Sequence, residues 1–245
     1  MSGHSKWANI QHKKGANDKK RASIFTKIIR ELSVAAKIGG SSAESNPRLR
    51  AAILKAKEAN MPKDTMEKAI KKGAGELESS HYDEFTYEGY GPDGVAIYME
   101  IMTDNKNRTS SDVKSSLAKN GGNLGANGCV SYIFHKKGVI LFDIAVISEE
   151  KAFEIGIDSG ADDVVTEDDN IIVYTNQENF EAVLKAFDDN NIAHISAEIT
   201  MVPDTYQVVS ADKVDKVIAL IDKLEDLDDI QAVYTNLKIP DDYNG

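Results

Sequence analysis

Apolar positions in the first 75 residues recur at the spacing of one helical face. A stripe three and four residues apart predicts a helix over about 18–38, closed by Gly39 and Gly40. Asn46 followed by Pro47 is a cap with proline at the first helical position and opens a second helix, and Pro62 opens a third. Three short amphipathic helices can bury their stripes only against one another, so the pattern predicts a small three-helix bundle.

Beyond a polar linker at 74–82 the pattern changes to strands alternating with helices. Residues 137–203 predict the order β-α-β-β-α-β, which is the split unit of ferredoxin-like domains. A strand–helix–strand unit before this segment, with its second strand at 129–134, and another unit after it, beginning with a strand at 206–209, would complete a second domain of the same order.

The predicted class is therefore α+β, with one domain inserted in another. The predicted domains are a helical domain at 1–78, a discontinuous α+β domain at 79–136 and 204–245, and an inserted ferredoxin-like domain at 137–203.

Charge is distributed unevenly along the chain, and this adds a prediction of function to the prediction of fold. Residues 1–75 contain 17 Lys and Arg against 6 Asp and Glu, a net charge of +11, and the remainder contains 12 against 34, a net charge of −22. Such a contrast predicts a basic domain that binds a polyanion, joined to an acidic body. The inserted segment alone has 3 basic and 15 acidic residues, so it should repel nucleic acid although its strand order resembles that of RNA-recognition folds.

The strongest functional feature is the basic segment at 3–32, in which aromatic and histidine residues are interleaved with cations. Cations supply the counterion release that dominates nucleic-acid affinity, and an exposed ring can stack on a base. The candidate nucleic-acid-binding residues are Lys6, Trp7, Lys13, Lys14, Lys19, Lys20, Arg21, Lys27 and Arg30. A solvated basic helix face with Trp7 in the bundle core would give the same pattern. No recognition-helix spacing or zinc finger is visible, so backbone binding is expected rather than base-specific binding.

A second candidate lies at 104–110, where two cations stand at the start of a predicted helix. Free amides beside Lys106, Arg108 and Thr109 would form an anion site. The favoured alternative is that Thr109 or Ser110 caps the helix and the cations are merely exposed. The glycine-rich turn at 121–128 lacks the lysine and hydroxyl of a phosphate loop and precedes a strand, so we interpret it as a mobile connection.

No other pattern indicates catalysis, a metal site or a cofactor. The single cysteine, Cys129, cannot form an intramolecular disulfide, which fits a reducing compartment. The histidines lack metal-ligand spacing, the acidic cluster at 158–169 fits no calcium loop, and no serine lies in a glycine-flanked elbow. The sequence also shows neither a signal-peptide pattern nor an apolar run of roughly 20 residues. We therefore expect a cytoplasmic, non-enzymatic protein without metal or cofactor.

Several long motifs carry a family resemblance. They include GHSKWANIQHKKGANDKKR at 3–21, NMPKDTMEKAIKKGAG at 60–75 and NRTSSDVKSSLAKNGGNLGANGCVSYIFHKKGVI at 107–140. With these the chain resembles the YebC/PmpR family, which includes the mitochondrial translational activator of cytochrome oxidase. The resemblance implies a helical N-terminal domain followed by two α+β domains. It also implies one of two roles, as a DNA-binding transcriptional regulator or as a ribosome-associated factor that helps translation through stretches such as consecutive prolines.

The expected function is thus regulation of gene expression through nucleic-acid binding. The leading hypothesis is a DNA-binding transcriptional regulator with promoter DNA as partner. The alternative is a translation factor that binds ribosomal RNA and relieves stalling, and a second alternative is a protein–protein adaptor whose acidic domains bind a basic partner. No membrane partner is expected.

Overall fold

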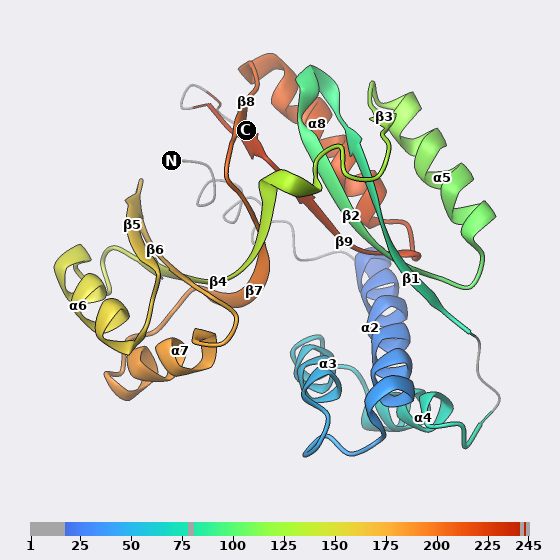
Figure 1. The fold of residues 1–245 in the computed structure, drawn as a ribbon, viewed down its shortest axis with the longest axis horizontal. Coiled ribbons are helices and arrows are strands. Elements are labelled where there is room, and N and C mark those ends of the chain that lie inside the picture. Colours follow the sequence, from blue (N-terminus) through green and yellow to red (C-terminus); the bar gives the residue numbers. More distant parts are fainter. Residues whose placement is uncertain (1–17, 78–80, 241–242, 244–245) are drawn as a thin grey trace.

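The computed structural model describes residues 18–77, 81–240 and 243, with the backbone alone for 18–21. It confirms a mixed α+β fold with antiparallel sheets (Figure 1). Three groups of elements follow one another along the chain, and the second group resumes after the third.

The first group is helical and is called the head below. It contains α2 (Asp18–Gly39), α3 (Pro47–Glu58) and α4 (Lys63–Gly73), which are the three helices predicted from the apolar spacing. Its core is made by small and medium side chains that are at most 5% exposed, namely Leu32, Ala35, Ala36, Leu49, Ala52, Ala56, Met61 and Ala69. Helix α4 touches α2 at Gly73, where an added Cβ would lie 2.0 Å from the carbonyl oxygen of Ser33. This close approach needs glycine.

The second group is an antiparallel sheet with two helices on one face. Its elements are β1 (Asp83–Tyr90), β2 (Ala96–Thr103), α5 (Lys106–Lys119), β3 (Asn123–Leu124), β8 (Gln207–Val208), α8 (Ala211–Glu225), β9 (Ile230–Thr235) and β10 (Leu237–Lys238). The strand order is β3-β1-β2-β9, while β8 and β10 form a separate parallel pair. Apolar side chains of α5 and α8 pack on the strands, and Val113, Leu117 and Leu220 are completely buried there.

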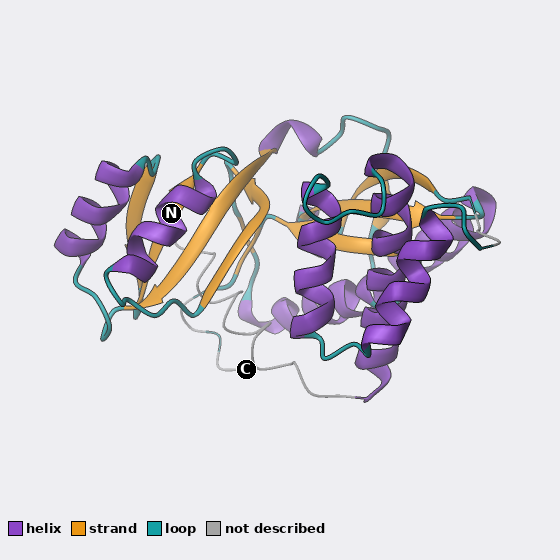
Figure 2. Ribbon diagram, turned by 90° about the horizontal axis from the view of Figure 1, so that it is seen from below, coloured by secondary structure: helices purple, strands orange, loops and turns teal. Residues whose placement is uncertain are grey.

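The third group has its own sheet and lies at one end of the molecule, away from the head (Figures 1 and 2). Its elements are β4 (Phe134–Asp143), α6 (Glu149–Ser159), β5 (Asp163–Glu167), β6 (Asn170–Thr175), α7 (Phe180–Asp189) and β7 (Ser196–Pro203). The antiparallel order β5-β6-β4-β7 is the one that a split β-α-β-β-α-β unit produces. The rings of Phe142 and Phe187, 4.5 Å apart between centroids, fill the space between this sheet and α7.

The two sheets meet through an aromatic cluster. Phe134 from the start of β4 lies 5.8 Å from the ring of Tyr98 on β2, and Tyr98 lies 6.2 Å from the ring of Tyr234 on β9. Val130 and Ala96 are buried in the same cluster. The start of β4 therefore packs against the sheet of the second group, called the middle sheet below, on the face that α5 and α8 leave open.

The middle group differs from the predicted second β-α-β-β-α-β domain. A hairpin of β1 and β2 precedes α5, and the strand that follows α5 is the two-residue β3, so the strand predicted at 129–134 is wrong. Residues 131–133 form a 3-10 turn, because their neighbouring amides are bound by the Glu88 carboxylate and are not available to a ladder. The strand predicted at 206–209 exists only as the short β8, outside the main sheet. The domain boundaries at residues 78, 136 and 203 stay a prediction.

Candidate nucleic-acid interface

Helices α3 and α4 carry a set of exposed lysines, called the α3–α4 lysines below. These are Lys55, Lys57, Lys68, Lys71 and Lys72. Within the described part of the chain, none of the five has a carboxylate at ion-pair distance, whereas the neighbouring Lys63 lies 3.6 Å from Glu67. Exposed cations without a carboxylate partner are available to phosphate groups.

The local fold explains why these lysines point outward. The apolar positions of α3 and α4 face the head core, which leaves the other positions to solvent. Lys68, Lys71 and Lys72 follow the i, i+3, i+4 spacing and therefore share one side of α4. Lys71 and Lys72 also stand in the last turn, where a cation interacts favourably with the helix dipole. The i, i+3, i+4 spacing of these lysines is the signal in the sequence that could have identified them.

Two hydrogen-bonded side chains fix the helices relative to one another. The amide nitrogen of Asn46 donates to the carbonyl oxygens of Ala35 and Gly40, both at 2.8 Å, while its Oδ1 accepts from the backbone of Leu49 at 3.0 Å. It therefore joins the end of α2 to the start of α3. The Ser33 hydroxyl donates to the carbonyl of Ala69 at 2.9 Å and joins α2 to α4. Helices α3 and α4, which carry the α3–α4 lysines, are therefore held in fixed positions relative to α2.

The candidate residues from the basic N-terminal segment fall into three groups. Lys6, Trp7, Lys13 and Lys14 lie outside the described residues, and Lys19, Lys20 and Arg21 lie in α2 at positions whose side chains are not described. Lys27 and Arg30 are the two candidates of this segment with described side chains. Both face the middle sheet.

Lys27 and Arg30 hold α2 against the loop that follows α8. The Lys27 ammonium donates to the carbonyl oxygen of Glu225, at the C-terminal end of α8, and burial lowers its pKa. Arg30 donates to the carbonyl oxygens of Met102 at 3.0 Å and Asp228 at 2.6 Å, and to Oδ1 of Asp229 at 2.7 Å. As candidate binding residues, Lys27 and Arg30 should face solvent. This expectation is wrong, because the end of α8 and the acidic loop after it cover both side chains.

Asp229 is the centre of a buried network that also involves the second predicted anion site. Its carboxylate accepts from Arg108 at 2.9 and 3.0 Å and from the Thr109 hydroxyl at 2.8 Å, besides Arg30. Burial alone would raise the pKa of Asp229, but the hydrogen bonds from Arg108, Thr109 and Arg30 outweigh it and lower that pKa. The anion at Arg108 and Thr109 is therefore a carboxylate of the chain itself.

The helix start at this site also differs from the expectation. Asn105, rather than Thr109 or Ser110, caps α5, with its side chain accepting from the backbone of Arg108 at 3.1 Å. Lys106 does not join the other two residues, since its ammonium lies 3.4 Å from Asp83 and 5.6 Å from the centre of the Phe85 ring. Lys106, Arg108 and Thr109 thus do not converge on an open anion site.

A buried carboxylate of the chain also holds the glycine-rich turn at 121–128. The buried Glu88 carboxylate accepts from the backbone amides of Gly128 at 2.7 Å and of Val130 and Ser131, both at 2.8 Å, and Tyr90 donates to the carbonyl of Cys129 at 2.9 Å. Although burial raises the pKa of Glu88, the three amide bonds lower it below its ordinary value. Contrary to the predicted mobile connection, these contacts hold the turn, and its amides already have an anionic acceptor.

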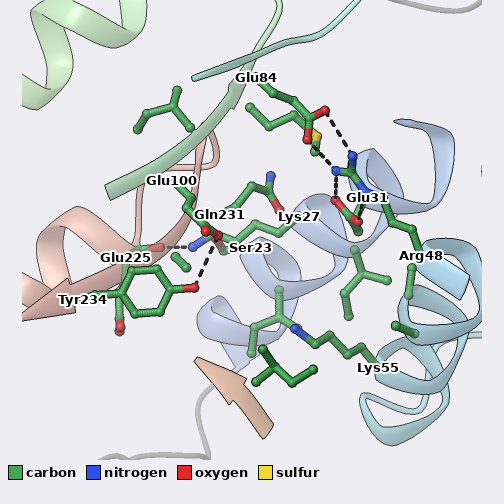
Figure 3. Close-up of a pocket in the computed structure, with 18 of the residues that line it drawn as sticks. Ser23, Lys27, Glu31, Arg48, Lys55, Glu84, Glu100, Glu225, Gln231 and Tyr234 are labelled. Atoms are coloured by element: carbon green, nitrogen blue, oxygen red, sulfur yellow. Dashed lines mark hydrogen bonds and ion pairs between the residues drawn. The ribbon is translucent and has the colours of Figure 1, made fainter. Parts of the chain in front are cut away.

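A cleft of about 1070 Å³ lies between the head, the middle sheet and strands β4 and β7 of the third group (Figure 3). Arg48 of α3 crosses it, donating to both oxygens of Glu31 at 2.6 and 2.8 Å and to Glu84 of β1, and these bonds raise its pKa. Tyr234 donates to Glu100 at 3.3 Å on the other side. Six carboxylates line this cleft against four cations, one of which is Lys55 of the α3–α4 lysines, so the cleft itself is a poor site for phosphate.

The described residues contain neither a metal-binding cluster nor a membrane-crossing helix. No three His, Cys, Asp or Glu side chains come together there in a way that could hold a metal ion. None of the described helices has both the length and the apolar composition of a membrane-crossing helix.

Comparison with known proteins places the chain. The model of the TACO1/YebC N-terminal domain matches residues 5–76, and the model of the TACO1/YebC second and third domains matches residues 82–237. The chain belongs to the TACO1/YebC family. Members of the family in Treponema denticola and Syntrophobacter fumaroxidans are 53% and 54% identical over 243 residues, which are 99% of this chain and 98% of each relative. Both are named as probable transcriptional regulatory proteins.

A solved crystal structure has a similar fold. A conserved hypothetical protein of Aquifex aeolicus is 45% identical, and the match covers 92% of this chain and 93% of that one with a TM-score of 0.77. The arrangement described above is thus similar to that of the Aquifex aeolicus protein over almost the whole length of both chains.

Proposed function

We propose that this member of the TACO1/YebC family is a non-enzymatic regulator of gene expression that binds nucleic acid through its head. Lys68, Lys71 and Lys72 carry the proposal, because they form an exposed basic row on α4 without carboxylate partners among the described residues. The lysines and arginines at 6–21, whose side chains are not described, belong to the same proposal by their charge alone. Relatives named as probable transcriptional regulatory proteins support DNA as the leading target.

The remaining groups of elements would orient the head rather than bind phosphate themselves. The segment from 137 to 203 has a net charge of −12, which repels a sugar-phosphate backbone. The domain division at 1–78, 79–136 with 204–245, and 137–203 belongs to this proposal, as does action in the cytoplasm. Ribosomal RNA presents the same phosphate chemistry, so it enters the test as a separate probe.

The test is a binding titration by fluorescence anisotropy with a labelled promoter duplex and with a ribosomal RNA fragment. The test variant reverses Lys68, Lys71 and Lys72 to glutamate. The control reverses Lys114, Lys119 and Lys151, which are exposed on other elements and produce the same change in net charge. Losing three phosphate contacts should weaken DNA binding at least about a hundredfold near 0.1 M salt and reduce the slope of log K against log salt by about 2.7.

The control variant should keep both the affinity and the slope within a few-fold of the unmodified chain. Equal losses in the two variants would mean that net charge matters and the α4 row does not, which contradicts the proposed site. Tighter binding of the ribosomal fragment would favour the translational role, and absence of binding to either probe would contradict nucleic-acid binding as a whole and favour the adaptor.

A further inference from the structure

Helix α6 turns large apolar side chains to solvent. Phe153 is 53% exposed and Ile157 is 39% exposed, and their i, i+4 spacing places them on the same side of the helix. The inner side is occupied by Ala152 and Gly156, which are buried against the sheet. Phe153 and Ile157 therefore contribute little to the core beneath the helix, unlike Ile155, which packs against it.

The packing beneath α6 is already complete without these side chains. A Cβ added to Gly156 would lie 3.2 Å from Cγ2 of Val164 on β5, which is tighter than ordinary contact. Ala152 is completely buried in the same core. Small residues bring the helix close to β5, so the outward position of Phe153 and Ile157 is not a consequence of poor fit on the inner side.

The turn before α6 continues the exposed apolar surface. Ile144 is 43% exposed and Val146 is 50% exposed, although Ile147 between the turn and the helix is buried. We call Ile144, Val146, Phe153 and Ile157 the α6 surface. Both ribbon views place α6 at the outer end of the molecule, remote from the head (Figures 1 and 2). Exposed apolar side chains on this helix and on the turn before it make this end of the molecule a candidate interaction site.

Carboxylates decide the chemistry of the partner. Glu149, Glu150, Glu154 and Asp158 are exposed on α6, against the single cation Lys151. Among the described residues, none of these four carboxylates has a cation at ion-pair distance. Such a rim repels nucleic acid and membranes with anionic lipids, and it attracts a segment that combines apolar side chains with lysine or arginine.

We propose that the α6 surface docks a partner protein through a basic amphipathic helix. The apolar side of that helix would cover Phe153 and Ile157, and its cations would reach Glu150 and Glu154. This site is distinct from the α3–α4 lysines and does not depend on nucleic-acid binding. The two surfaces lie at different ends of the molecule, so both can be occupied together.

The probe is a synthetic amphipathic helix of leucine and lysine, and the comparison probe carries glutamate in place of each lysine. The full chain is titrated with each probe while its backbone amide chemical shifts are monitored. The lysine probe should change the shifts of residues 144–158. Replacing both Phe153 and Ile157 with serine should weaken binding about tenfold or more, as for a central apolar anchor. The matched control replaces Ile38 and Leu54, which are 67% and 54% exposed on the head, and should leave the affinity unchanged.

A second variant tests the charge without touching the apolar side chains. Reversing Glu150 and Glu154 to lysine should weaken binding of the lysine probe and strengthen binding of the glutamate probe. Equal binding of both probes to the unmodified chain, or shifts confined to the cleft, would overturn the proposal. Sedimentation that shows a dimer lost on replacing Phe153 and Ile157 would also overturn it, because the occupant would then be a second copy of the chain.

Discussion

The cations of α2 and those of α4 have the same charge but face different surroundings. Lys27 and Arg30 lie against carbonyl and carboxylate oxygens from the loop after α8, whereas Lys68, Lys71 and Lys72 face solvent. The difference arises from the tertiary packing and not from the helices themselves, which are both amphipathic. Charge density in a segment therefore does not locate a ligand surface until the carboxylates of the other elements are placed.

The same comparison applies to the two sites that first suggested phosphate. Asp229 occupies the position beside Arg108 and Thr109, and Glu88 occupies the amides at 128–131. Each site has the donors that bind an anion, and in each the anion comes from the chain. These two sites therefore hold the fold together, and among the described residues the exposed lysines of α4 are a better candidate for binding an external anion.

Removing the Asp229 carboxylate should have the largest effect on stability. Asp229→Ala leaves Arg30, Arg108 and Thr109 without their shared acceptor in a buried position, so we expect the free energy of unfolding to fall by about 3–5 kcal/mol. Urea denaturation measures it, with the exposed Asp112→Ala as control. A loss no larger than in the control would show that the network does not join the head to the middle sheet.

Removing the charge of Glu88 should have a smaller effect. Glu88→Gln retains one acceptor oxygen for three amides, so we expect a loss of about 1–3 kcal/mol. Hydrogen exchange at the amides of Gly128, Val130 and Ser131 should also become faster. Unchanged exchange at these amides, with Glu76→Gln as an exposed control, would contradict the role assigned to Glu88.

The two buried carboxylates also predict the pH dependence of stability. Their pKa values are lowered below the ordinary 3.8 of Asp229 and 4.5 of Glu88, so the folded chain binds these protons more weakly than the unfolded chain. Their stabilisation is complete above the ordinary pKa values and is lost as the pH falls from these values through the lowered pKa values of the folded chain. The free energy of unfolding should therefore decline below about pH 5, and less steeply in Asp229→Asn. Equal slopes for the two proteins would contradict this assignment.

Much of the fold was predictable because it depends on local patterns. The three head helices follow from the spacing of their apolar residues, and the order of elements at 137–203 follows from alternating strand and helix segments. The strand predicted at 129–134 was wrong, because the amides there are bound by Glu88, which lies 40 positions or more away in the sequence. No local pattern contains that contact.

The site was less predictable for the same reason. The contacts of Lys27 and Arg30 with the loop after α8 span about two hundred residues, and a helical stripe cannot reveal them. The row at Lys68, Lys71 and Lys72, by contrast, was readable from spacing alone. Its exposure and its lack of a carboxylate partner among the described residues separate this row from Lys27 and Arg30, and that contrast required the structure.

The most direct test measures stability and affinity together in two variants. One replaces Lys27 and Arg30 with glutamine, and the other replaces Lys68 and Lys71 with glutamine. We predict that the α2 variant loses stability and keeps its affinity for the nucleic-acid probe, and that the α4 variant keeps its stability within about 0.5 kcal/mol and binds the probe more weakly. Weaker binding by the α2 variant at unchanged stability, with full affinity in the α4 variant, would contradict the account.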